Sequence, residues 1–148
     1  MTKIIFIGLL LIAAFFAGQV TTSLLYKGGN LKIPAGQQAF THLSPEQFNA
    51  ELSTGEYTLL DVRTGDEYAA GHLKNALQAD YYQTQQFSDY LETLNKNSMY
   101  LIYCRTGIRS GKAMQVMQDK GFKNVSDLAG GYNAWVAENL STVVSNPQ

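Results

Sequence analysis

A single cysteine is the residue of this chain whose surroundings most favour chemistry. Cys104 stands next to Arg105 and five residues before Arg109, directly after the apolar run 99–103 and before a helical pattern. A loop that leads from a strand into a helix N-terminus binds anions, and nearby positive charge favours the thiolate form of a cysteine. We therefore predict that Cys104 is a nucleophile that attacks an oxyanion or accepts sulfur.

The loop after the cysteine is expected to hold its sulfur. Gly107 permits a tight turn, and inward-pointing backbone N–H groups of residues 105–110 would form an anion-binding nest, to which Ser110 adds a hydroxyl. The alternative is a small apolar cysteine buried at a strand end. The flanking arginines and the glycine turn favour the nucleophile. The predicted substrate-binding residues are Arg105, Thr106, Gly107, Ile108, Arg109 and Ser110.

Alternating strands and helices are expected to position this loop. The predicted strands are 57–60, 75–79, 99–103 and 124–128, and the predicted helices are 45–54, 65–70, 84–95, 109–120 and 132–139. Such alternation predicts an α/β domain with a parallel sheet and helices on both faces. Ser44, Pro45 and Gln47 form the pattern of a capping box at the first helix. We place the domain at 39–140, after a linker at 27–38 and before a flexible tail at 141–148.

Length, charge and cysteine content limit the classes of function. The chain has 148 residues, which suits one domain, and a net charge of −1. No basic stripe is present, so we expect no nucleic-acid partner. One cysteine excludes an intramolecular disulfide.

The N-terminus predicts export or anchoring in a membrane. Lys3 precedes the segment 4–26, which carries no charged residue. Residues 1–26 are therefore interpreted as a signal peptide or an uncleaved apolar helix, which at ~35 Å would span a bilayer. We expect the domain to be periplasmic or exported, with association to the inner membrane through residues 4–26 in the anchored case. A domain facing the cytoplasm is the remaining alternative.

Three co-linear motifs between residues 42 and 140 resemble those of single-domain rhodaneses, a family of sulfurtransferases. The loop Cys-Arg-Thr-Gly-Ile-Arg-Ser from Cys104 resembles their active-site loop. The other two are the segment 60–76, with Asp-Val-Arg, Glu-Tyr, Gly-His-Leu and Asn-Ala, and the segment 128–135, Leu-Ala-Gly-Gly-Tyr-Asn-Ala-Trp. The resemblance implies a small rhodanese-like parallel sheet.

Loop length separates two related activities. Cysteine phosphatases resemble this loop but have the form Cys-x5-Arg, and here Ser110 occupies that arginine position. The shorter loop resembles the sulfurtransferase form, so a phosphatase or an arsenate reductase is a weaker alternative. A non-catalytic or carrier module that binds persulfide or a partner protein is the second hypothesis.

The resemblance implies a double displacement through a persulfide on Cys104. A small anionic donor such as thiosulfate would give its outer sulfur, a thiol or cyanide would accept it, and no metal or organic cofactor would be needed. Arg105 and Arg109 would guide the donor. From their place beside the predicted sheet, Asp61, Arg63 and Glu67 are interpreted as structural support, with Arg63 paired for example with Glu67. His72 and Trp135 are expected to be structural.

Overall fold

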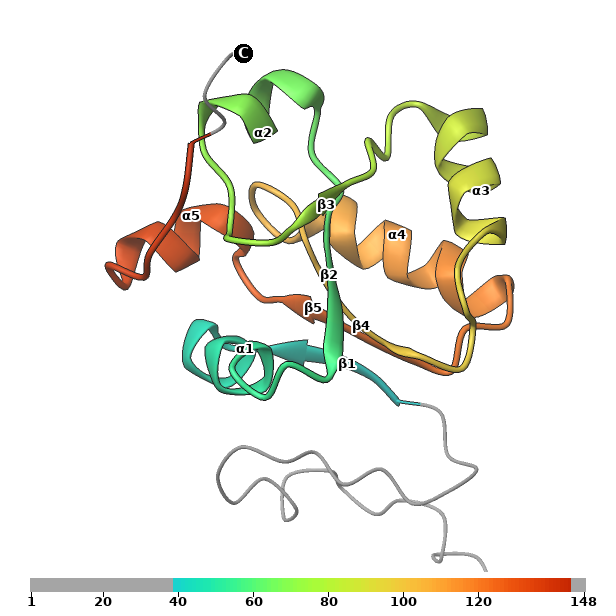
Figure 1. The fold of residues 1–148 in the computed structure, drawn as a ribbon, viewed down its shortest axis with the longest axis horizontal. Helices are drawn as coiled ribbons and strands as arrows, with labels where there is room; N and C mark the ends of the chain where they lie inside the picture. Colours follow the sequence, from blue (N-terminus) through green and yellow to red (C-terminus); the bar gives the residue numbers. More distant parts are fainter. Residues whose placement is uncertain (1–38, 145–148) are drawn as a thin grey trace, which may run out of the picture.

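The computed structural model describes residues 39–144, which form a five-stranded sheet in the order β1-β5-β4-β2-β3 (Figure 1). The strands are β1 (Ala39–Leu43), β2 (Tyr57–Asp61), β3 (Leu77–Gln78), β4 (Met99–Tyr103) and β5 (Asn124–Leu128). Every neighbouring pair is parallel. The carboxyl ends of all five strands therefore lie along the same edge of the sheet, where loops can build a site.

Helices cover both faces of the sheet, as parallel sheets require. They are α1 (Pro45–Leu52), α2 (Gly65–Ala70), α3 (Thr84–Glu92), α4 (Ile108–Asp119) and α5 (Gly131–Ala137). Figure 1 shows α3 and α4 on one side of the sheet and α1 and α5 on the other. Two separate apolar cores result, and the predicted α/β architecture with helices on both faces is confirmed.

The central strand β4 distributes its side chains between the two cores. Tyr100 and Ile102 belong to the core under α3 and α4, whereas Leu101 and Tyr103 belong to the core under α1 and α5. This alternation follows from the two-residue period of a strand. Cys104, the next residue, continues it and joins the α3 and α4 core.

The predicted first helix forms with its capping box. Ser44 Oγ accepts a hydrogen bond from Gln47 N at 3.3 Å, and Ser44 N donates to Gln47 Oε1 at 3.0 Å. Pro45 opens the helix, where its missing N–H costs nothing. The boundaries of the other predicted helices and strands differ from the structure by at most three residues.

Strand β1 was not predicted, because its sequence carries a weak signal. It is an edge strand that pairs with β5 alone, and of its residues only Leu43 is buried. An edge strand with one neighbour lacks the continuous apolar run of a central parallel strand.

The segments before and after the domain were predicted as an apolar segment, a linker and a flexible tail. The predicted apolar segment 4–26 and linker 27–38 lie outside the described residues, and no helix within residues 39–144 is long and apolar enough to cross a membrane. Val143, in the segment predicted as a tail, exchanges two backbone hydrogen bonds of 2.8 Å with His72. Part of that segment is thus attached to the domain.

Candidate functional site

Cys104 lies at the carboxyl end of β4, between β2 and β5, and is buried. Its Sγ accepts a hydrogen bond from Gly107 N at 3.2 Å, and Ser110 Oγ lies 3.6 Å away. Of the loop amides predicted to surround the sulfur, that of Gly107 contacts it, and the Ser110 hydroxyl is within reach. A backbone amide and a hydroxyl at this position stabilise negative charge on sulfur.

The N-terminus of α5 fixes the orientation of the loop. Tyr132 N donates to the Cys104 carbonyl at 2.7 Å, and Asn133 N donates to the Arg105 carbonyl at 3.0 Å. Because these two carbonyls point toward α5, the N–H groups of the same peptide units, those of Arg105 and Thr106, point away from α5. The N–H groups of Thr106 and Ile108 have no acceptor within the described part of the chain. They are available to an anion.

Gly131 is required for this contact between α5 and the loop. Its backbone has φ +62°, and a Cβ there would overlap the carbonyl oxygen of Cys104 and lie 2.7 Å from Thr106 N. Only glycine removes both the steric overlap and the strain of a positive φ. The Gly-Gly turn thus lets the loop and α5 approach closely.

Arg109 is directed at Glu67 by a bidentate ion pair. Its Nη1 and Nη2 lie 2.6 Å and 2.7 Å from the two carboxylate oxygens. Glu67 also caps α2, because its side chain accepts from Thr64 N. The hydrogen bond from Arg109, opposed by partial burial, lowers the pKa of Glu67 to about 2, and the bond to Glu67 raises the pKa of Arg109.

The remaining loop side chains face solvent. Arg105, Thr106 and Ile108 are exposed, and Arg105 forms no ion pair with any residue of the described part of the chain. Of the two arginines predicted to guide an anionic donor, Arg105 is therefore the one whose charge is uncompensated. Arg109 contributes its charge through the pair with Glu67.

A second ion pair, between Asp61 and Arg63, is buried beneath the site. Arg63 Nη2 lies 2.5 Å from Asp61 Oδ2 and donates to the Gly71 carbonyl at 2.7 Å. The guanidinium carbon lies 4.1 Å from the ring centre of Tyr132. Burial lowers the pKa of Arg63, but the hydrogen bond and charge of Asp61 outweigh it, so the pKa is raised.

These contacts correct one predicted pairing and support two predicted roles. Arg63 pairs with Asp61 and not with Glu67, because both side chains leave the end of β2 only two residues apart. His72 Nδ1 lies 3.0 Å from the Tyr68 carbonyl and its ring stacks on Tyr68, which is a structural contact. Trp135 is buried in the core under α1 and α5.

Two residues near the sulfur were missed by the sequence reasoning. Asp127, on β5, lies 3.0 Å from Ser110 Oγ through its Oδ2, and its Oδ1 is hydrogen-bonded to His42 on β1. A charged residue inside a short predicted strand, directly before the Leu-Ala-Gly-Gly turn, was the available signal for Asp127. His42 carried none, because β1 itself was not predicted.

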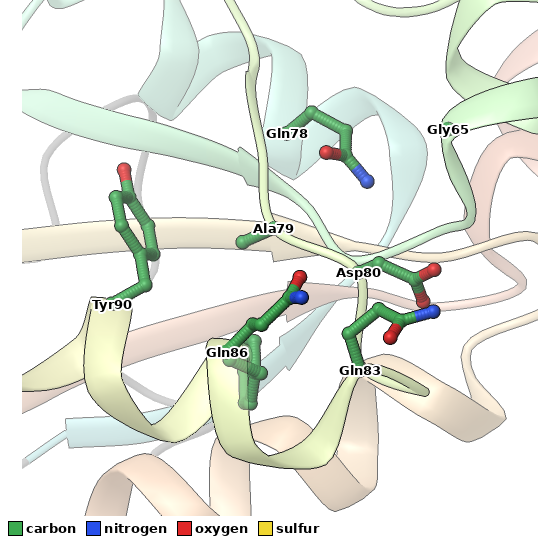
Figure 2. A pocket seen from close by; sticks show the side chains of 8 residues that line it. Gly65, Gln78, Ala79, Asp80, Gln83, Gln86 and Tyr90 are labelled. Atoms are coloured by element: carbon green, nitrogen blue, oxygen red, sulfur yellow. The ribbon is translucent and has the colours of Figure 1, made fainter.

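A pocket of about 500 Å³ lies between α3 and the segment around β3, and none of its lining residues belongs to the Cys104 loop. Figure 2 shows Gln86 and Tyr90 rising from α3 toward the segment that carries Gln78 and Ala79. The lining residues are Gly65, Gln78, Ala79, Asp80, Gln83, Gln86, Phe87 and Tyr90. This lining has amides and one carboxylate but no cation, so it does not suit a small dianion.

Comparison with known proteins gives a family and a fold. The profile of the family described as "Rhodanese-like domain" matches residues 44–138, more than half of the chain. A rhodanese-like domain protein from Staphylococcus aureus has a solved structure with a TM-score of 0.62 and 26% identity, covering 73% of this chain and 100% of that one. A rhodanese-related protein from Thermoplasma volcanium, at 22% identity and a TM-score of 0.62, covers 71% of this chain and 99% of that one and shows the same fold.

Curated relatives match over the same domain only. A protein of Chlamydia abortus named tRNA uridine(34) hydroxylase is 34% identical over 99 residues, which are 64% of this chain and 30% of that protein. A protein of the same name from Bdellovibrio bacteriovorus is 35% identical over 100 residues, covering 66% of this chain and 29% of its own length. The chain thus spans about a third of the length of these relatives.

Proposed function

We propose that this chain, which belongs to the family of rhodanese-like domains, is a sulfurtransferase. Its nucleophile is Cys104, in the loop that follows β4. One observation carries the proposal above the others. The lone cysteine accepts a hydrogen bond from Gly107 N in a six-residue loop whose remaining amides include unpaired ones. That arrangement stabilises a thiolate or a persulfide and leaves donors for an oxyanion.

The reaction is a double displacement. The Cys104 thiolate attacks the outer sulfur of thiosulfate, the Sγ–S bond forms, and sulfite leaves with the electron pair of the broken S–S bond. An acceptor such as cyanide or a thiol then attacks the outer sulfur of the persulfide. The Sγ–S bond breaks, its electrons return to Sγ, and the thiolate is restored without net oxidation.

The residues around the loop have separate tasks in this reaction. Arg105, exposed and without an ion pair among the described residues, attracts the anionic donor. Gly107 N and Ser110 Oγ stabilise the charge that returns to Sγ when the outer sulfur leaves. The burial of Cys104 shields its Sγ from bulk water.

The names of the curated relatives give a second candidate, a role in chemistry at a tRNA uridine. The match to them is confined to about a third of their length, and the net charge of −1 does not favour a nucleic-acid partner for this chain. Sulfur transfer to a small acceptor is therefore the function that we propose. The export or anchoring predicted from residues 4–26 stays a prediction, since that segment lies outside the described residues.

The test is the mass of the protein after treatment with thiosulfate. We expect a gain of one sulfur atom with release of sulfite, and discharge of that sulfur by cyanide as thiocyanate. The chain has one cysteine, so the modified residue is unambiguous, and Cys104→Ser should abolish the gain. The matched control is Ser98→Ala, outside the loop, which should transfer sulfur at the wild-type rate.

Three outcomes would contradict the proposal. Iodoacetamide labelling without any sulfur gain would show a reactive thiol that is not a sulfur acceptor. A stable persulfide that neither cyanide nor a thiol discharges would favour the carrier module. Transfer that survives in Cys104→Ser would exclude Cys104 as the nucleophile.

A further inference from the structure

A chain of hydrogen bonds joins the Cys104 sulfur to the surface at the edge of the sheet. It runs from Cys104 Sγ to Ser110 Oγ at 3.6 Å, and from there to Asp127 Oδ2 at 3.0 Å. Asp127 Oδ1 is hydrogen-bonded to Nδ1 of His42. The Asp127 side chain is 1% exposed and the His42 side chain 66% exposed, so the chain begins in the core and ends in water.

The fold brings these residues together from four elements. Register pairs His42 of β1 with Asp127 of β5, and Ile102 of β4 lies on the other side of Asp127. Ser110 comes from the first turn of α4, and Cys104 follows β4. The arrangement is therefore set by strand pairing and helix packing and not by a loose surface contact.

Ser110 is the branching point of the chain, because its hydroxyl has one hydrogen and three acceptors in reach. They are Cys104 Sγ, the Gly107 carbonyl at 3.1 Å and Asp127 Oδ2. An ionised Asp127 accepts only, and a charge-assisted bond draws the hydroxyl hydrogen toward it. A protonated Asp127 donates to Ser110 Oγ instead, which frees the hydroxyl to donate to the sulfur.

The surroundings of Asp127 favour exchange of that proton. Burial raises the pKa of Asp127, while the charge of His42 and the hydrogen bond from Ser110 oppose the rise. His42 from β1 is the one charged group that acts on Asp127 among the described residues; β4 contributes Cys104, and α4 contributes Ser110. The His42 side chain is largely exposed, so the pair is open to solvent on the β1 side.

We propose that His42 and Asp127 act as a positioning pair that directs the Ser110 hydroxyl toward or away from the Cys104 sulfur. The inference rests on the proposed function. When an acceptor attacks the outer sulfur and the Sγ–S electrons return to Sγ, a hydroxyl aimed at Sγ stabilises the leaving thiolate. No proton is transferred to the sulfur. The proton on the pair only determines which atom accepts the hydrogen bond that the Ser110 hydroxyl donates.

The experiment measures the rate of Cys104 alkylation by iodoacetamide as a function of pH, together with the rate of sulfur transfer from thiosulfate to cyanide. In the wild type we expect a second inflection in the alkylation profile, where Asp127 loses its proton. Asp127→Asn cannot titrate and should therefore remove this inflection. At pH values above the wild-type inflection, it should raise the alkylation rate by roughly 10-fold, the effect of a hydrogen bond to a charged group. Ser110→Ala should also remove the inflection, and at pH values below the wild-type inflection it should lower the alkylation rate.

The decisive comparison is the double variant. If Asp127 acts through Ser110, adding Asp127→Asn to Ser110→Ala changes the alkylation rate by less than about 2-fold. If Asp127 acts on the sulfur directly through its charge, the change is as large as in the wild-type background, and the proposal is overturned. Persistence of the second inflection in Asp127→Asn also overturns it.

Two further variants at exposed positions distinguish an effect of the pair from an effect of misfolding. His42→Gln changes an exposed side chain on an edge strand and should move the inflection to higher pH, because the charge that lowers the pKa of Asp127 is lost. An unmoved inflection in this variant counts against the pair. Asp119→Asn, on the exposed end of α4, is the matched control and should leave the profile unchanged.

Failure of this inference and failure of the proposed function give different results. An alkylation profile that responds to Asp127→Asn in a protein that transfers no sulfur would remove the sulfurtransferase and keep the positioning pair. Sulfur transfer with a pH profile identical in the wild type, Asp127→Asn and His42→Gln would keep the sulfurtransferase and remove the pair.

Discussion

Two arginine–carboxylate pairs flank the Cys104 loop, and they differ in how far water reaches them. Asp61 and Arg63 are buried, and the guanidinium lies 4.1 Å from the ring centre of Tyr132. In the pair of Glu67 and Arg109, the side chains are 25% and 12% exposed. Both use a bidentate or multiple contact of an arginine with one carboxylate, so the difference between them comes from their surroundings.

The buried pair acts as a scaffold for the loop. Arg63 connects the end of β2 to the Gly71 carbonyl and to Tyr132, the residue whose backbone N–H holds the Cys104 carbonyl. The outer pair instead ties α2 to the first turn of α4 at the mouth of the site, where Arg109 also lies 5.2 Å from the ring centre of the exposed Tyr82. We infer that the buried pair determines whether the loop forms and the outer pair determines the charge that a donor meets.

Removing one partner of the buried pair should have the largest effect. Arg63→Met leaves the Asp61 carboxylate buried without its cation, and we expect the free energy of unfolding to fall by about 3–5 kcal/mol. Urea denaturation followed by circular dichroism measures the change. The double variant Asp61→Leu/Arg63→Met removes both charges and should recover part of the loss.

A loss below about 1 kcal/mol in Arg63→Met would show that the buried pair behaves like a surface salt bridge. The division between scaffold and mouth would then have no energetic basis. Equal stability of the single and the double variant would likewise show that Asp61 does not need its partner.

The outer pair should have a smaller effect on stability and opposite effects on donor binding. Glu67→Gln and Arg109→Gln each break the pair, and each should cost about 1 kcal/mol, reduced from a buried pair by exposure to solvent. Glu67→Gln leaves Arg109 unpaired and should lower the KM for thiosulfate by about 2-fold, whereas Arg109→Gln should raise it by a similar factor. Steady-state kinetics at low and high salt measure both.

The control for this comparison is salt. Because the effect on KM is electrostatic between partly exposed groups, it should fade at high ionic strength in both variants. A shift of KM in the same direction in the two variants would mean that the geometry of the pair, and not the net charge at the mouth, governs donor binding.

The same contrast between buried and exposed groups explains what the sequence could predict. The strand 99–103, the glycine turn and the capping box depend on local patterns, and the structure has them where they were expected. Pairings between distant residues were harder, because local periodicity carries no information on them. Arg109 meets Glu67 across 42 positions, and Asp127 meets His42 across 85. The edge strand that carries His42 has only a weak apolar pattern, with Leu43 as its one buried residue.

The smallest predicted effect is a change of stability with pH that belongs to the outer pair. The pKa of Glu67 is about 2 in the folded protein, lowered chiefly by the hydrogen bond from Arg109, against an ordinary value of 4.5. The unfolded chain therefore binds the Glu67 proton more readily, so the pair contributes fully above pH 4.5 and its contribution is lost as the pH falls toward 2.

We expect the difference in unfolding free energy between wild type and Glu67→Gln, at most about 1 kcal/mol at neutral pH, to vanish near pH 2. The hydrogen bonds from Lys120 and Lys96 likewise lower the pKa of Glu92 to about 2, but its side chain is 52% exposed. The variant Glu92→Gln should therefore show a smaller difference at neutral pH than Glu67→Gln does. If the two variants gave equal differences at every pH, partial burial at the mouth would add nothing to the Glu67–Arg109 pair, and the outer pair would be an ordinary surface salt bridge.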